Sequence, residues 1–126
     1  MNKKSLCVGI DVGSEELVVA AQRGNEPVKT GTFSNDAEGH KKLVNWMKPL
    51  RSVRVVLEAT GNYHLDLARL LCETREVEVM VANPRTVRRF AEAQNQRAKT
   101  DQVDAVVLLK YGQIMSFQKW VCPPAQ

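Results

Sequence analysis

The sequence predicts an α/β domain built on a mixed five-stranded sheet flanked by helices, in the order βββαβαβα. Two observations lead to this prediction. The first part of the chain holds three strand-like apolar runs joined by short turns, which is typical of an antiparallel meander. After residue 34 the apolar spacing becomes helical and then alternates between helix and strand, which is typical of strand–helix crossovers.

Three strands are expected in the first third of the chain. Residues 4–12 are apolar on both faces, as expected at the centre of a sheet. Residues 17–23 follow after a turn at Gly13–Ser14, and residues 27–33 follow after a turn at Gly24–Asn25. Connections this short predict antiparallel neighbours.

The first helix is expected before Pro49, which ends it, and either Ser34 or Asn35 can cap its start. Apolar side chains recur there at helical spacing. They are Leu43, Val44, Trp46 and Met47. His40 lies on this helix just before two lysines, so we expect it on the surface.

Strands and helices then alternate. Residues 52–59 return to a strand pattern, and residues 63–74 are helical, with leucines on one side. Residues 76–82 alternate valines with other side chains, which predicts a strand with one wet face near a sheet edge.

The last helix of this order is expected in two pieces. Asn83 as N-cap and Pro84 in the first helical position predict a helix start. Thr100 can cap the second piece. Its expected apolar stripe is Val103, Val106, Val107 and Ile114. Trp120 lies in a tail that is expected to fray, and we expect it to dock on a further domain.

Composition narrows the class of protein. The chain has 126 residues, 44% of them hydrophobic and 25% charged, which suggests one globular domain. Three widely spaced cysteines give no disulfide framework and no cysteine metal site. No apolar run could span a bilayer and the start does not resemble a signal peptide, so we expect a cytoplasmic protein. The net charge of +4 permits nucleic acid as a partner.

Four carboxylates fall at the ends of expected elements. Asp11 ends the first strand and Glu58 ends the fourth, so both would emerge at one rim if these strands are parallel neighbours. Asp101 and Asp104, spaced i, i+3, would share a helical face. Converging carboxylates select Mg²⁺ or Mn²⁺, and two such ions about 3.5–4 Å apart can clamp a phosphodiester.

Each acid has a simpler explanation when taken alone. Asp11 could be a turn residue, Glu58 a surface residue at a strand end, and Asp101 a partner of the helix dipole. The metal hypothesis is stronger because one fold would bring all four to one place.

A basic strip precedes the last acidic pair. Arg85, Arg88 and Arg89 have i, i+3, i+4 spacing, and Arg97 and Lys99 follow. Beside a metal site such a strip would hold a phosphate backbone, whereas alone it would be a solvated helix face.

The turn after Glu58 has a weaker claim to nucleic-acid contact. Thr60 and Gly61 could approach a phosphate closely, or they could form an ordinary entry to the next helix with Asn62 as cap.

Three motifs resemble one known family. "VGIDVGSEELVVA", "VLEATGNYH" and "VANPRTVRRFAEAQNQRAKTDQVDAVVLL" resemble the N-terminal domain of bacterial insertion-sequence transposases of the DEDD type, which include pilin-gene invertases and bridge-RNA-guided recombinases. The resemblance implies an RNase H-like (RuvC-like) fold over residues 1–117. It also implies that Asp11, Glu58, Asp101 and Asp104 form the family's acidic tetrad.

The resemblance has implications beyond this domain. Family members continue into a C-terminal domain with a serine nucleophile, so residues 118–126 would be a tail leading to a domain absent from this chain. Family members also assemble as dimers and tetramers, and the better-studied ones bind a guide RNA.

The function expected is therefore that of a DNA transposase or recombinase domain. With Mg²⁺ (Mn²⁺ as substitute) at the tetrad, it would help cut and rejoin DNA of a mobile element and its target. One alternative is a fragment that binds nucleic acid or oligomerises but cleaves nothing. A remote alternative is a nucleotide-binding domain of the actin-like and sugar-kinase class, although the sequence shows neither a second Gly-rich phosphate loop nor an adenosine motif.

Overall fold

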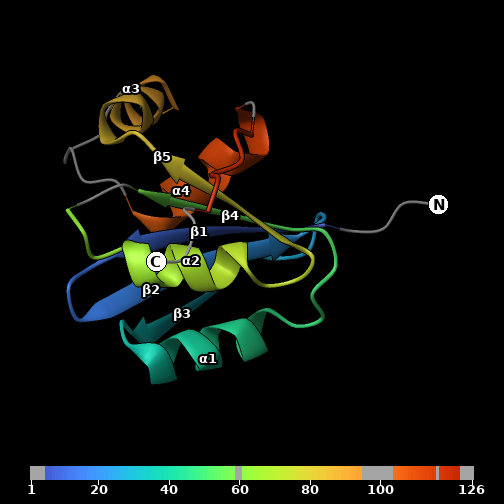
Figure 1. Cartoon of the computed structure of the whole chain (residues 1–126). Helices are drawn as coiled ribbons and strands as arrows, with labels where there is room; N and C mark the ends of the chain where they lie inside the picture. Colours follow the sequence, from blue (N-terminus) through green and yellow to red (C-terminus); the bar gives the residue numbers. More distant parts are fainter. Residues whose placement is uncertain (1–4, 59–60, 95–103, 116, 123–126) are drawn as a thin grey trace.

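The computed structural model describes residues 5–58, 61–94, 104–115 and 117–122. They form a five-stranded sheet with helices on both faces, as predicted (Figure 1). The elements are β1 (Leu6–Val12), β2 (Glu16–Arg23), β3 (Lys29–Ser34), α1 (Ala37–Met47), β4 (Val53–Glu58), α2 (Leu65–Cys72), β5 (Val77–Ala82), α3 (Pro84–Gln94) and α4 (Ala105–Ile114).

The strand order is β3-β2-β1-β4-β5. The first three strands form an antiparallel meander, whereas β4 and β5 run parallel to β1. This arrangement confirms the mixed sheet and places β1 at its centre. It is consistent with the RNase H-like fold that the resemblance implies.

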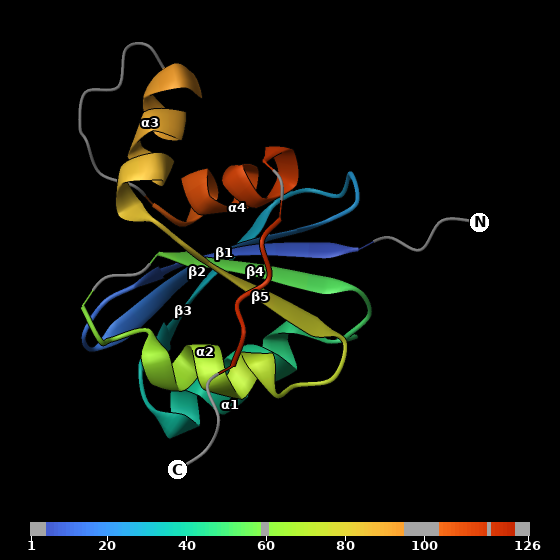
Figure 2. The same ribbon diagram turned by 45° about the horizontal axis from the view of Figure 1, so that its top comes forward.

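Helices α1 and α2 cover one face of the sheet (Figures 1 and 2). The core on this face is aliphatic and includes Ile10, Leu57, Leu43 and Leu67, all of which are inaccessible to solvent. Burying one such side chain contributes about 1.5–3 kcal/mol before entropic costs. The two crossovers are therefore held on the sheet mainly by apolar burial.

Helix α4 lies across the opposite face and approaches β1 closely (Figure 2). A Cβ atom on Gly9 would collide with the backbone of Ala105 and Leu109, and one on Gly112 would collide with the Val56 side chain. Only glycine permits this contact between helix and sheet. These glycines therefore set how near the start of α4 comes to the end of β1.

The apolar stripe expected for α4 is confirmed only at Val107, which is partly buried and packs on the cluster shared with α3. Val106 and Ile114 are 36% and 60% exposed, and Val103 lies outside the described residues. The side toward the sheet is formed by Ala105, Leu108, Leu109, Tyr111 and Gly112. The two small residues of this set, Ala105 and Gly112, lie where the helix and the sheet approach most closely.

Two helix caps differ from expectation. Asp36, rather than Ser34 or Asn35, caps α1 by accepting a hydrogen bond from the Gly39 amide at 2.8 Å. Asp104 caps α4, and the cap expected at Thr100 lies outside the described residues.

The cap expected for α3 is confirmed. The Asn83 side chain accepts a hydrogen bond from the Arg85 amide at 2.8 Å, and α3 begins at Pro84.

Strand β5 forms an edge of the sheet, as expected, but the face that was expected to be exposed to solvent is mostly buried. Met80 and Ala82 are buried in a cluster with Phe90, Leu108 and Tyr111 of α3 and α4. Only Glu78 remains partly exposed on this face. Helices α3 and α4 therefore cover the face of β5 that the alternating pattern predicted to be exposed to solvent.

The segment after α4 crosses the edge strand β5 and reaches the side of the sheet covered by α2 (Figure 2). The Trp120 amide donates a hydrogen bond to the Val79 carbonyl at 2.6 Å, and the Trp120 side chain packs against the core beneath α1 and α2. Trp120 thus packs on this domain. None of the helices in the described ranges is long and apolar enough to cross a membrane.

Candidate metal site and nucleic-acid interface

Asp11 and Glu58 lie at the same rim of the sheet. Ile10 pairs with Leu57 in the parallel ladder between β1 and β4, so the next residues, Asp11 and Glu58, occupy corresponding positions in the register. Side chains two positions apart in a strand share a face. Asp11 therefore shares the face of Gly9, and Glu58 that of Val56, which is the face covered by α4.

Asp104 approaches this rim from α4. The packing of Ala105 on Gly9 brings the start of the helix over the end of β1. Asp104 is the residue just before Ala105, and its Oδ1 accepts a hydrogen bond from the Val107 amide at 3.0 Å. This bond orients the carboxylate as a helix cap and leaves its second oxygen available for another contact.

The electrostatics of Asp11 link these two carboxylates. Burial raises the pKa of the Asp11 carboxyl, and the negative charge of Asp104 raises it further. Both effects disfavour an ionised Asp11. A divalent cation between the carboxylates would offset both, and oxygen ligands of this kind suit Mg²⁺ or Mn²⁺.

The complete tetrad is not visible in the described residues. Asp101 lies outside them, and within them no three acidic, histidine or cysteine side chains lie close enough together to hold a metal. The shared helical face expected for Asp101 and Asp104 involves a residue outside the described ranges; Asp104 itself is the N-cap of α4, with extended backbone (φ −112°, ψ −179°).

The basic helix starts at the same rim. Glu58 pairs with Ala82 at the end of β5, and α3 begins two residues later at Pro84. A cavity of about 440 Å³ lies there, lined by Asn83, Pro84, Arg85 and Arg88.

The arginines of α3 are available for contacts outside the chain. Arg85, Arg88 and Arg89 are exposed and form no ion pair with the described part of the chain. Helix α3 is joined to α4 by an edge-to-face contact between Phe90 and Tyr111, with ring centroids 5.3 Å apart. The same packed pair of helices thus carries the arginines and Asp104.

The other expected nucleic-acid contacts are less well defined. Arg97, Lys99 and Thr60 lie outside the described residues. Gly61 is exposed and has a φ of +54°, a conformation that favours glycine.

Sequence reasoning missed two polar residues near the rim. His40, expected on the surface, is only 5% exposed, and its Nε2 lies 2.8 Å from Asn35 Oδ1. The Asn35 amide donates hydrogen bonds to the carbonyls of Gly13 and Tyr63 at 2.8 and 3.0 Å. Helical spacing could have indicated the burial of His40, because it lies in line with Leu43 and Met47.

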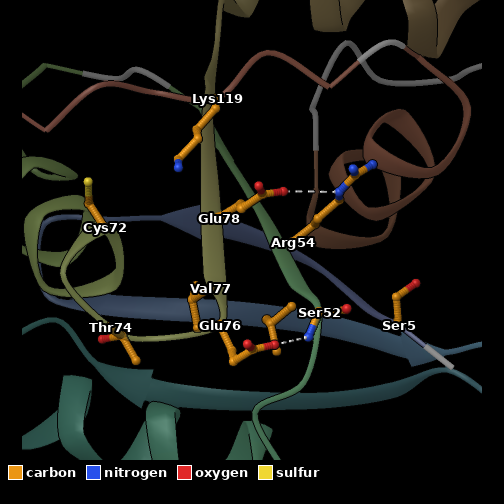
Figure 3. A pocket seen from close by; sticks show the side chains of 10 residues that line it. Ser5, Ser52, Arg54, Cys72, Thr74, Glu76, Val77, Glu78 and Lys119 are labelled. Carbon is orange, nitrogen blue, oxygen red and sulfur yellow. Dashed lines mark hydrogen bonds and ion pairs between the residues drawn. The ribbon is translucent and has the colours of Figure 1, made fainter. Parts of the chain in front are cut away.

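A separate cavity of about 780 Å³ lies at the opposite end of the sheet, where the parallel strands begin (Figure 3). Arg54 pairs with Glu78 there at 3.3 Å, and Glu76 accepts a hydrogen bond from the Ser52 amide at 3.1 Å. Lys119 also projects into this cavity (Figure 3). It is distinct from the carboxylate rim.

Comparisons with known proteins show the family to which the chain belongs. The family model for IS110-type DEDD transposases, described as a transposase, matches residues 8–121. The chain is similar to a pilin gene-inverting protein of Moraxella bovis, with 31% identity over 109 residues, covering 83% of this chain and 33% of that protein. It is also similar to a pilin gene-inverting protein of Moraxella lacunata, with 31% identity over 85 residues, covering 64% and 26%.

This chain spans about a third of the length of these curated relatives or less. The family match favours the transposase hypothesis over the nucleotide-binding one. Its extent, from within β1 to beyond Trp120, covers both the sheet and the helices that carry the carboxylates and arginines. The chain belongs to the DEDD transposase family.

Proposed function

We propose that this chain is the metal-binding domain of a DNA recombinase. In this proposal Asp11, Glu58, Asp101 and Asp104 hold Mg²⁺, or Mn²⁺ as a substitute, beside the scissile phosphate. The observation that carries it is the partly buried Asp11, whose pKa is raised by burial and by Asp104. Two neighbouring carboxylates, one of them partly buried, are best tolerated when a cation lies between them.

The residues of this chain would have separate roles. Asp11, on the central strand, would be the shared ligand, and Asp104 would hold its carboxylate steady through the bond to Val107. Arg85 and Arg88 would hold the DNA backbone at the start of α3. The bound cation would neutralise charge that develops on the phosphate oxygens.

The remainder of the activity is proposed to depend on other parts of a longer protein. The resemblance implies a further domain after residues 118–126 that carries a serine nucleophile, and the greater length of the relatives is consistent with it. We also propose homo-oligomers of the longer protein, DNA of the mobile element and its target as substrates, a guide RNA as partner and a cytoplasmic location.

A second function is proposed for the chain on its own. The chain spans about a third of the length of its relatives or less. This observation favours a module that binds nucleic acid and assembles with other parts of the protein but cleaves nothing alone.

Calorimetric titration with Mn²⁺ tests the metal site. We expect saturable binding by the parent chain and a large loss of affinity in Asp11→Asn. Glu78→Gln, which removes a carboxylate at the opposite end of the sheet, is the control and should bind as the parent does. Equal binding by all three chains would refute the proposed site.

Cleavage of branched or single-stranded DNA in Mn²⁺ then separates the two functions. Cleavage that disappears in Asp11→Asn would show that the chain is a nuclease by itself. Binding of DNA without cleavage would identify it as the module.

A further inference from the structure

Asn35 connects two loops through its side chain. Its amide nitrogen donates hydrogen bonds to the Gly13 carbonyl at 2.8 Å and to the Tyr63 carbonyl at 3.0 Å. Gly13 belongs to the turn between β1 and β2, and Tyr63 belongs to the segment between β4 and α2. One side chain therefore joins segments that are far apart in the sequence.

His40 fixes the orientation of this amide. Both hydrogens of the Asn35 amide are directed to carbonyl oxygens, so Oδ1 must be the acceptor toward His40 Nε2, 2.8 Å away. His40 lies one turn into α1 and is buried, so its ring has little freedom to turn. The buried imidazole keeps the Asn35 amide from flipping.

The backbone around Asn35 holds the same turn. The backbone N–H of Asn35 donates a hydrogen bond to the Glu15 carbonyl at 2.9 Å. The turn itself is closed by a hydrogen bond from the Gly13 backbone N–H to the Glu16 carbonyl, also 2.9 Å. The tip of the β1–β2 hairpin is thus fixed by both the main chain and the side chain of one residue.

The position of these loops gives the contact a functional meaning. Gly13 follows Asp11 by two residues, and Tyr63 follows Glu58 by five. Asn35 therefore joins the two segments that extend from the ends of β1 and β4. Asp11 and Glu58 occupy corresponding positions in the register at these strand ends. The bond to the Gly13 carbonyl holds the turn that directly continues the strand carrying Asp11.

We infer that Asn35, oriented by His40, is a positioning residue that preorganises Asp11 and Glu58 for a divalent cation. This inference rests on the proposed function. Asn35 touches no cation itself and acts through the backbone on either side of the rim. Groups that orient metal ligands from outside commonly change metal affinity by about 10–100-fold when removed.

The chain offers a matched control at the other end of the sheet. The Arg23 guanidinium likewise donates to two carbonyls, those of Pro49 at 2.8 Å and Met47 at 3.4 Å. It joins β2 to the segment after α1, far from the carboxylates. Arg23→Ala removes a comparable contact between segments and reports the effect of lost stability alone.

The test is Mn²⁺ titration of the parent chain, Asn35→Ala and Arg23→Ala, with folding checked by circular dichroism. We expect Asn35→Ala to weaken Mn²⁺ binding about tenfold or more. Arg23→Ala should bind as the parent does even if its melting temperature falls. Equal affinity of folded Asn35→Ala and the parent would overturn the inference alone, and so would an equal loss in both variants.

Variants at His40 decide the question if Asn35→Ala does not fold. His40→Gln retains an N–H donor toward Asn35, whereas His40→Ala removes it. We expect His40→Ala to weaken Mn²⁺ binding and His40→Gln to restore part of the affinity; parent-like binding by both would overturn the inference. A parent chain that binds no Mn²⁺ would overturn the proposed function, and the inference with it.

Discussion

Asp11 at the end of β1 and Asp104 at the start of α4 are electrostatically coupled. Burial raises the pKa of the Asp11 carboxyl, and the negative charge of Asp104 raises it further. The coupling exists because α4 packs directly on Gly9, two residues before Asp11. Asp104 cannot simply be removed to relieve this repulsion, because its side chain also caps α4 through the Val107 amide.

Replacing Asp11 by asparagine should stabilise the metal-free domain at neutral pH. The pKa of Asp11 is raised above its ordinary value of 3.8, so its contribution to stability is fully present below that value and is lost as pH rises through the raised pKa. We expect a gain of at most about 1 kcal/mol at pH 7, since water screens a half-exposed carboxylate. Urea denaturation in EDTA at pH 3.5 and pH 7 measures it.

The advantage of Asp11→Asn should shrink toward acidic pH, where the parent carboxyl is protonated. A variant that is less stable than the parent at pH 7 in EDTA would show that Asp11 has a structural role instead.

A methyl group on Gly9 should displace α4. The Cβ of alanine would meet backbone atoms of Ala105 and Leu109, which cannot move without moving the helix. We expect Gly9→Ala to cost about 3 kcal/mol or more in unfolding free energy and to weaken any response to Mn²⁺. Thermal unfolding with and without Mn²⁺ measures both effects.

Gly31→Ala is the control for this substitution. Gly31 also lies in a strand, but the atoms nearest to its Cβ would belong to the Phe33 and Trp46 side chains, at 3.1 and 3.5 Å. These rings can adjust, so Gly31→Ala should change stability by less than about 1 kcal/mol and leave the Mn²⁺ response intact. A similar loss in both variants would mean that contact with α4 is not the cause.

His40 should make the domain less stable as the pH falls. Burial lowers the pKa of His40, although the charges of Asp36 and Asp66 oppose this effect. A lowered pKa means that the unfolded chain takes up the proton first, so stability is present above the ordinary value of 6.5 and is lost as pH falls. Unfolding midpoints of the parent and His40→Gln between pH 5 and 8 should converge toward the acidic end.

Parallel pH profiles for these two chains would contradict this prediction. They would show that the imidazole of His40 is as easily protonated in the folded domain as in the unfolded chain.

Local patterns in the sequence predicted the sheet and its central strand. They also placed Asp11 and Glu58 at one rim, because a meander followed by crossovers makes the first and fourth strands parallel neighbours. The face of α4 was not predictable in this way. Its contact depends on Gly9 and Gly112, which contribute little to apolar periodicity and act through the absence of a side chain.

The Asn35 contacts could not be predicted for a different reason. Its partners, Gly13 and Tyr63, are main-chain carbonyls of two distant loops, and backbone acceptors leave no mark on residue type. His40 was misplaced because neighbouring lysines suggested a wet face, although its spacing relative to Leu43 put it on the buried side.

Removing two arginines of α3 should weaken DNA binding through the phosphate backbone. Arg85 and Arg88 line the cavity at the start of α3, at the rim that carries Glu58. If each contacts one phosphate, Arg85→Ala with Arg88→Ala should lower the slope of log K against log salt by about 2. Fluorescence anisotropy with labelled DNA at several salt concentrations measures this slope.

The matched control removes two exposed arginines elsewhere. Arg51 and Arg75 flank the starts of β4 and β5, at the opposite end of the sheet. Arg51→Ala with Arg75→Ala changes the net charge by the same amount, so any loss of long-range attraction is shared by the two double variants. A smaller slope of log K against log salt in the α3 variant alone would locate the phosphate contacts at the rim. Equal slopes in both variants would mean that the arginines of α3 act only through long-range electrostatic attraction.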